Sequence, residues 1–110
     1  MFNQKKIKDM TEKEITGVGF IYKKVLPKLH EIQMSLALNR HFTTEVEAGC
    51  YKFGVSMTIY VKSDVMNSSQ EILKVKTFSF PSYRYKGVKS YDKTLRGIDY
   101  FISNWMNKLA

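Results

Sequence analysis

Apolar residues in the first third of the chain recur at the spacing of an α-helix. They are separated by three or four residues in turn: Ile15, Val18, Tyr22, Val25, Leu29, Ile32 and Leu36. This spacing places them on one helical face. Residues 11–14 read TEKE, a capping box that predicts the start of the helix. Pro27 lacks an amide hydrogen, so a kink or break is expected near residue 27. A bent core helix is favoured over a coiled-coil seam, because three heptads interrupted by proline supercoil poorly.

The period changes to two after residue 41, which predicts two strands. One face of the first strand carries Phe42, Thr44, Val46 and Ala48, and one face of the second carries Tyr51, Phe53, Val55, Met57, Ile59 and Val61. A two-residue turn at positions 48–49 would pair Val46 with Tyr51 and would place all these residues on one face of the hairpin. On the other face, Glu45 would then lie opposite Lys52, a favourable cross-strand pair.

Residues 71–80 predict a third strand after a loop at 63–70, and Pro81 is expected to end it because proline cannot donate to a ladder. The odd positions Leu73, Val75 and Thr77 are expected to join the apolar face of the hairpin. The even positions would then lie on the opposite face together with Tyr60: Lys74, Lys76, Phe78 and Phe80.

The last segment again has a helical period. Ser90 is a candidate N-cap, and the apolar stripe behind it contains Tyr91, Leu95, Ile98, Ile102, Trp105 and Leu109. Trp105 lies on this stripe and is expected in the core. The predicted fold is therefore one α+β domain over residues 1–110, a two-layer sandwich of a helix, a three-stranded antiparallel sheet and a helix. Residues 1–10 are expected to be frayed.

Catalytic and metal-binding patterns are weak in this sequence. The histidines His30 and His41 have no evident partners for a metal, and Cys50 is interpreted as a structural thiol. Glu45 and Glu47 share a strand face but are interpreted as solvated side chains. We therefore expect a non-enzymatic protein without a metal or another cofactor.

The compartment is predicted from what the chain lacks. A single cysteine excludes an intramolecular disulfide and favours a reducing compartment. No apolar run is long enough to span a bilayer, and the N-terminus does not resemble a secretory signal. We expect a cytoplasmic protein, of a bacterial cell or an infected host, that does not associate with membranes.

Positive charge is concentrated in one part of the chain. The whole chain has 18 Lys and Arg against 10 Asp and Glu, a net charge of +8. Residues 72–96 hold seven of these cations and only one acid, Asp92. Because cations bind phosphates and aromatic rings stack on bases, the candidate nucleic-acid-binding residues are Lys74, Lys76, Tyr83, Arg84, Tyr85, Lys86, Lys89, Lys93 and Arg96. Phe78, Phe80 and Tyr60 would form a stacking platform for DNA or RNA bases beside them.

Two other interpretations of this segment stay open. The basic surface could dock on an acidic protein, as in a regulator, assembly factor or inhibitor encoded by a phage or mobile element. The segment could also be solvated charge, with Phe78 and Phe80 buried by the N-terminal helix and the lysines extended towards water. Homodimerisation fits either binding case, because free sheet edges and a second aromatic face are surfaces that natural proteins cover.

The order of elements is similar to that of double-stranded-RNA-binding domains and of the histone-like bacterial HU proteins. The motifs differ from both. The start of the last helix reads SYDKTLRG, with one lysine and an acid where the RNA-binding domains have a lysine cluster. The loop after the second strand contains VMNSSQ and lacks the Arg-Asn-Pro turn of the HU proteins. The resemblance therefore covers the order of elements, and no family's residues are transferred to this chain.

Overall fold

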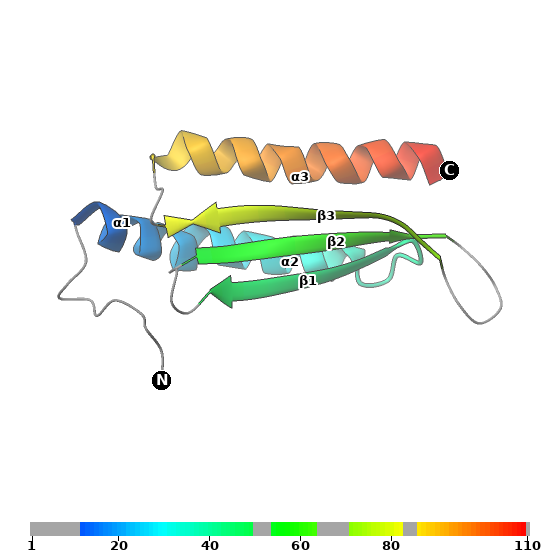
Figure 1. Cartoon of the computed structure of the whole chain (residues 1–110), viewed down its shortest axis with the longest axis horizontal. Helices are drawn as coiled ribbons and strands as arrows, with labels where there is room; N and C mark the ends of the chain where they lie inside the picture. The colour runs from blue at the N-terminus through cyan, green and yellow to red at the C-terminus, as the bar shows by residue number, and fades with distance from the viewer. Residues whose placement is uncertain (1–11, 50–53, 64–70, 83–85, 110) are drawn as a thin grey trace.

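The computed structural model describes residues 12–49, 54–63, 71–82 and 86–109. The expected fraying of residues 1–10 lies outside these ranges. The elements are α1 (Glu12–Phe20), η2 (Ile21–Val25), α2 (Leu26–Leu36), β1 (Phe42–Gly49), β2 (Gly54–Lys62), β3 (Ile72–Pro81) and α3 (Val88–Leu109) (Figure 1). The strands form one antiparallel sheet in the order β1-β2-β3. The predicted α+β class with a three-stranded antiparallel sheet is confirmed.

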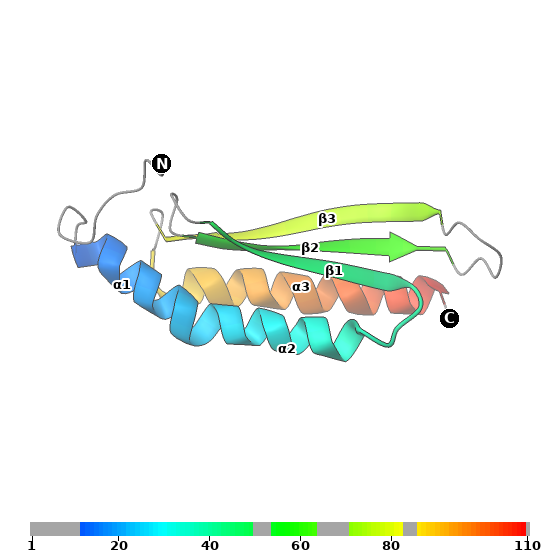
Figure 2. The same ribbon diagram turned by 90° about the horizontal axis from the view of Figure 1, so that it is seen from below.

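Both helical segments lie on the same side of the sheet, as Figure 2 shows. α2 runs along β1, α1 projects beyond the end of the sheet, and α3 runs antiparallel to β3. The core lies between the helices and the sheet, and its largest fully buried side chains include Phe80, Ile21, Leu29, Met57, Ile59 and Ile98. None of the helices in the described ranges covers the other sheet face.

A π-helical turn interrupts the N-terminal helix. The Leu26 amide donates to the carbonyl of Ile21, five residues back, and Pro27 follows at the start of α2. Because Pro27 cannot donate to Lys23, the α-helical ladder is broken at this point. The helix axis changes direction here, so the predicted kink is observed (Figure 2).

The π turn changes which residues face the core. Val25, Leu29, Ile32 and Leu36 are buried as expected, but Tyr22 is 44% exposed and Ile21 is fully buried. The longer turn accommodates one more residue between Val25 and the preceding core position. The prediction that Tyr22 belongs to the apolar stripe was wrong for this reason.

The hairpin has the predicted faces but a different register. Val46 pairs with Met57, and Phe42 pairs with Val61. β1 therefore ends at Gly49, and β2 begins opposite it at Gly54. The predicted pairing of Val46 with Tyr51 was wrong. A shift by an even number of residues leaves each side chain on its original face. Glu45 pairs with Thr58 and accepts a hydrogen bond from the Tyr60 hydroxyl at 3.4 Å, whereas Lys52 lies outside the described residues.

The face of β3 that packs on the helices is the opposite of the predicted one. Phe78 pairs with Met57 and Phe80 with Val55, so both rings share the buried face of β2. Phe78 is 9% and Phe80 0% exposed. Their rings lie edge-on against Phe101 and Tyr91 of α3, at centroid separations of 5.9 and 5.8 Å. The burial of Phe78 and Phe80, which the solvated-charge alternative predicted, is therefore observed, and their ring-to-ring contacts given above are with α3.

The uncovered sheet face is polar over much of its area. The hydroxyls of Thr58 and Thr77 share a hydrogen bond of 2.9 Å across β2 and β3. Leu73 and Val75 lie near the start of β3, where both are exposed. The predicted inclusion of these two residues in the core was wrong, because α1, α2 and α3 all lie on the opposite side of the sheet.

α3 begins at Val88, two residues before the predicted N-cap Ser90. Its stripe faces the core as expected: Tyr91 and Ile98 are buried, while Leu95, Ile102, Trp105 and Leu109 are partly buried against the core. Tyr91 also donates a hydrogen bond of 2.8 Å to the carbonyl of Pro81. This contact joins the end of β3 to the first turn of α3.

Candidate nucleic-acid interface

The outer face of α3 carries a row of cations. Lys89, Lys93 and Arg96 are all exposed and are separated by four and three residues. Each lies two residues from Tyr91 or Ile98, the buried residues of the same helix. Two residues correspond to about 200° of rotation around an α-helix. These three side chains therefore project directly away from the core.

Uncharged polar residues continue the same row towards the C-terminus. They are Tyr100, Ser103, Asn104 and Asn107, and all four are exposed. Tyr100 is 76% exposed and lies four residues after Arg96. We call the seven residues from Lys89 to Asn107 in this row the outer face of α3. The face contains no acidic residue, and each of its side chains has a hydrogen-bond donor.

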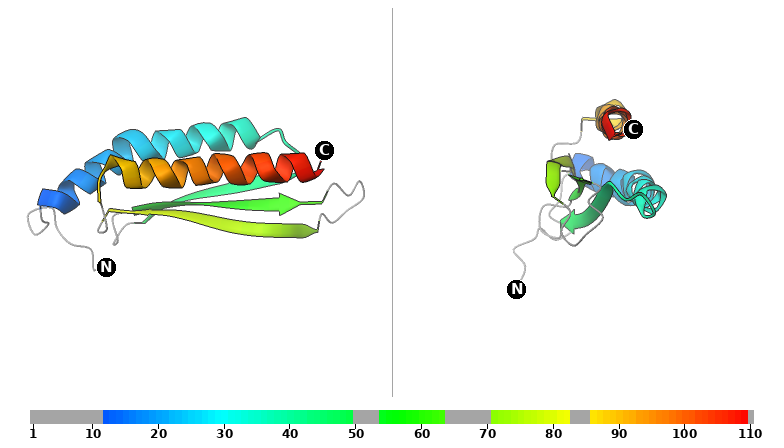
Figure 3. Two further views of the ribbon diagram at one scale, coloured as in Figure 1. Left: turned by 90° about the horizontal axis from the view of Figure 1, so that it is seen from above. Right: turned by 90° about the vertical axis from the view of Figure 1, so that its right-hand side faces the viewer.

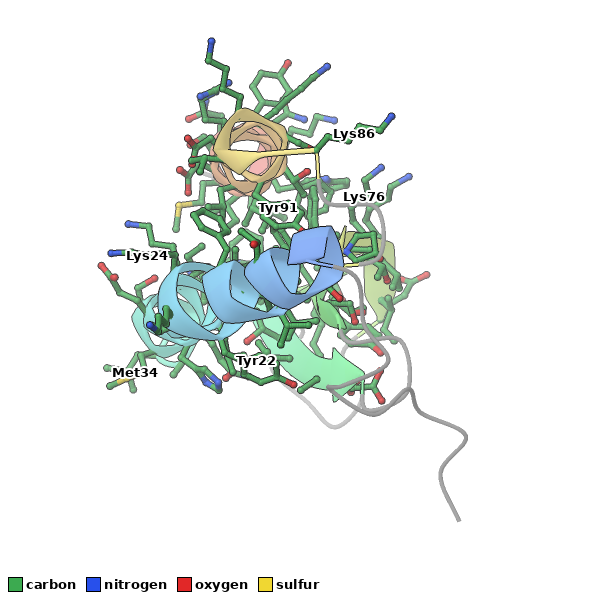
Figure 4. All side chains as sticks on the ribbon, turned by 90° about the vertical axis from the view of Figure 1, so that its left-hand side faces the viewer. Tyr22, Lys24, Met34, Lys76, Lys86 and Tyr91 are labelled. Carbon is green, nitrogen blue, oxygen red and sulfur yellow. The ribbon has the colours of Figure 1, made fainter. Side chains whose placement is uncertain are left out.

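The side of α3 towards β3 has further cations beside it. The packing of Phe78 against Phe101 defines this side, and a Cβ atom at Gly97 would lie 3.7 Å from the Phe78 ring. The neighbouring Lys76 is exposed, with its ammonium 5.9 Å from the Phe78 ring centroid. Lys74 is also exposed, two positions further along the same strand face. In Figure 4, Lys76 and Lys86 lie on one side of the molecule and Lys24 lies on the other.

Two acids border the opposite side of the outer face. Asp92 and Asp99 lie about half a turn around α3 from Phe101, and Asp99 is exposed. Around α3, the positive side chains therefore lie along the outer face and on its β3 side, and the two acids lie on the other side. A polyanion would be attracted to the outer face and its β3 side and repelled from the side of Asp92 and Asp99.

The structure brings together only part of the predicted site. Lys86, Lys89, Lys93 and Arg96 are exposed at the start of α3 and along it, and Lys74 and Lys76 border the helix from β3. Tyr83, Arg84 and Tyr85 lie outside the described residues. The predicted stacking platform was wrong, because Phe78 and Phe80 are buried and Tyr60 belongs to the uncovered sheet face.

Sequence reasoning missed the second half of the outer face. Tyr100, Ser103, Asn104 and Asn107 were not predicted as site residues. The signal was present, because they lie opposite the correctly predicted stripe of α3. Lys108 was also missed; its ammonium lies 4.8 Å from the ring centroid of Trp105.

The other residues considered for chemistry lie in ordinary surroundings. His30 is exposed on α2, and the His41 ring lies 3.3 Å from the carbonyl oxygen of Lys62. Cys50 is outside the described residues. In the described ranges, no three His, Cys, Asp or Glu side chains are grouped so that they could hold a metal ion. None of the helices in these ranges has the length and apolarity needed to cross a membrane.

In a comparison with known proteins, no family model, no curated protein and no solved structure matches the chain. The candidate interface therefore depends on the placement of its own residues.

Proposed function

We propose that this protein is a non-enzymatic nucleic-acid-binding protein that uses the outer face of α3 and the adjoining cations Lys74, Lys76 and Lys86. The observation that carries the proposal is the alignment of Lys89, Lys93 and Arg96 on the exposed side of one helix. Cations in a row can contact successive phosphates at the same time. Each contact releases counterions, which is the main source of affinity for nucleic acids.

The proposed surface differs from a stacking site. The rings of Phe78 and Phe80 contribute to the core, so contacts with phosphates replace base stacking on the sheet. The lysines of β3 retain a role in this arrangement. Lys74 and Lys76 extend the positive surface from the helix to the edge of the sheet.

A charge-matched pair of variants tests the proposal. One variant combines Lys89→Ala, Lys93→Ala and Arg96→Ala. The control combines Lys23→Ala, Lys24→Ala and Lys28→Ala, three exposed cations of η2 and α2. Both variants lose three charges, and alanine is well tolerated in helices. Binding to a fluorescent 30-nucleotide probe, single- or double-stranded, is followed by anisotropy at about 0.1 M salt.

The proposal predicts a loss of about tenfold or more in affinity for the α3 variant and a much smaller loss for the control. Equal losses would show that only net charge matters, and equal binding of the α3 variant and the parent would overturn the proposal. Circular dichroism and thermal unfolding of both variants establish that the fold is intact.

A second function, docking on an acidic protein, is favoured by a different observation. Ile72, Leu73 and Val75 of β3 are exposed next to Lys74 and Lys76, so apolar and cationic groups adjoin at one sheet edge. Protein interfaces combine an apolar centre with a polar rim, and the two lysines would lie at such a rim. Phe78 and Phe80 are buried and cannot serve as anchors for such a partner. A stoichiometric partner recovered from nuclease-treated lysate would support this function, and its absence would count against it.

Homodimer formation remains a prediction. Of its two reasons, the free sheet edges and a second aromatic face, only the first still holds. β1 and β3 are both edge strands of the sheet, as the first reason requires. The second reason, an exposed aromatic face, no longer holds because Phe78 and Phe80 are in the core. Light scattering at two protein concentrations tests the prediction, and a monomeric mass at both would refute it.

A further inference from the structure

We infer that the nucleic acid bound is double-stranded DNA and that the outer face of α3 enters its major groove. This inference rests on the proposed function and adds the type of nucleic acid and the mode of contact. It depends on the shape of α3, on the order of residues along it and on the burial of the aromatic rings.

The first argument is shape. Seen along its axis, α3 stands out as a separate ridge, with the sheet and α2 on one side of it only (Figure 3). An α-helix with its side chains is about 10–12 Å across, and the major groove of B-DNA is about 12 Å wide. The row from Lys89 to Asn107 spans about 27 Å at 1.5 Å per residue. A convex ridge of this length fits a groove better than it fits a flexible single strand.

The second argument is the chemistry along the ridge. Its first half carries Lys89, Lys93 and Arg96, which suit phosphates and the acceptor atoms of guanine. The second half carries a hydroxyl from Ser103 and amides from Asn104 and Asn107, and asparagine can pair with adenine in the major groove. No carboxylate interrupts this row. The face therefore combines groups that position DNA with groups that can contact base edges.

The third argument is the placement of the aromatic rings. Single-stranded nucleic acids are held mainly by stacking of bases on exposed rings. Among the described residues of the outer face, Tyr100 is the only aromatic residue. Phe78, Phe80 and Tyr91 are buried. The described surface thus offers a row of hydrogen-bond donors instead of a platform for unpaired bases.

The shape of RNA duplexes separates them from DNA. The major groove of A-form RNA is deep and narrow, so a helix cannot enter it. An α3 that binds inside a groove should therefore prefer B-form DNA. Lys74, Lys76 and Lys108 would then meet the phosphate chain on the β3 side. Asp92 and Asp99 would lie towards the phosphate chain on the other side of the groove and would weaken binding there.

The test compares three 20-nucleotide probes of one sequence at about 0.1 M salt: duplex DNA, single-stranded DNA and duplex RNA. We expect duplex DNA to bind at least about tenfold more tightly than the other two. Methyl green, which occupies the major groove, should displace the protein, whereas netropsin, which occupies the minor groove, should not. The double variant Asn104→Ala, Asn107→Ala should weaken duplex binding about threefold to tenfold while leaving the salt dependence unchanged.

The outcomes separate this inference from the proposed function. Equal affinity for the three probes, or displacement by netropsin alone, would overturn the inference. The proposed function would survive that result if the variant at Lys89, Lys93 and Arg96 still lost binding. Failure of all three probes to bind would overturn both.

Discussion

The ring of Phe78 on β3 packs edge-on against Phe101 on α3, with an interplanar angle of 72°. This contact secures α3 to the edge strand and turns Lys89, Lys93 and Arg96 outwards. Phe78→Ala should lower the free energy of unfolding by about 3–5 kcal/mol, as expected for loss of a buried ring. The neighbouring Val75→Ala should cost less than about 1 kcal/mol, because Val75 is exposed. Urea unfolding measures both, and the reverse order would contradict the observed face of β3.

The π turn predicts that substitutions at two adjacent residues differ in their effect on stability. Ile21 is fully buried, so Ile21→Ala should destabilise the protein by about 2–5 kcal/mol. Tyr22→Ala should change the stability by about 1 kcal/mol or less, since Tyr22 is half exposed. A regular α-helix with Tyr22 in its apolar stripe would give the opposite order. Thermal and urea unfolding of the two variants distinguish these cases.

Replacing two glycines by alanine should change the stability of the protein in opposite directions. At Gly97 in α3, an added Cβ would make an ordinary contact of 3.7 Å with the Phe78 ring. Gly97→Ala should therefore stabilise the protein by about 1 kcal/mol through helix propensity. At Gly54, the Cβ would lie 3.0 Å from the Phe80 carbonyl oxygen and 3.1 Å from the Pro81 Cα. Gly54→Ala should cost about 1–3 kcal/mol, and equal effects at the two sites would contradict this description of the packing.

Removing the acids beside the outer face should increase affinity. The double variant Asp92→Asn, Asp99→Asn is expected to bind duplex DNA about threefold to tenfold more tightly at low salt, because repulsion from phosphates is removed. The control Glu45→Gln, Glu47→Gln makes the same change in charge on β1, where both side chains are exposed. Competition titration of the two variants measures the difference, and equal gains would point to net charge alone.

Binding should also depend steeply on salt. Contact with three to six phosphates gives a slope of about −3 to −5 in a plot of log K against log salt concentration. Affinity would then fall about 50-fold to 1,000-fold between about 50 and 200 mM salt. The variant lacking Lys89, Lys93 and Arg96 should have a slope shallower by about two to three. A slope near zero for the parent protein would contradict an electrostatic interface.

Some features of the fold were predictable because they depend only on the burial of apolar residues that recur at a regular spacing. The stripe of α3 was predicted correctly, since Tyr91 and Ile98 recur at helical spacing and the opposite positions are polar. That pattern also contained the outer face of α3. The faces of the hairpin were predictable for the same reason, but its register was not. A shift by six residues keeps Val46 on the same face, and alternation alone cannot detect it.

The face of β3 could not be read from alternation because its pattern changes along the strand. Leu73 and Val75 are apolar at the odd positions, whereas Phe78 and Phe80 are apolar at the even ones. Residues 72–77 are exposed on both faces, so burial selects a face only towards Pro81. The π turn was hidden in a similar way. Ile21 and Tyr22 are adjacent and both apolar, so helical spacing accommodates either residue.

The π turn also determines the orientation of α1. It is equivalent to one residue inserted into an otherwise regular helix. Deleting one residue between Ile21 and Val25 would remove the extra residue, although Pro27 would still donate no hydrogen bond, and would rotate α1 by about 100° relative to α2. This single turn therefore works as an angular spacer, which orients α1 relative to the sheet and α3.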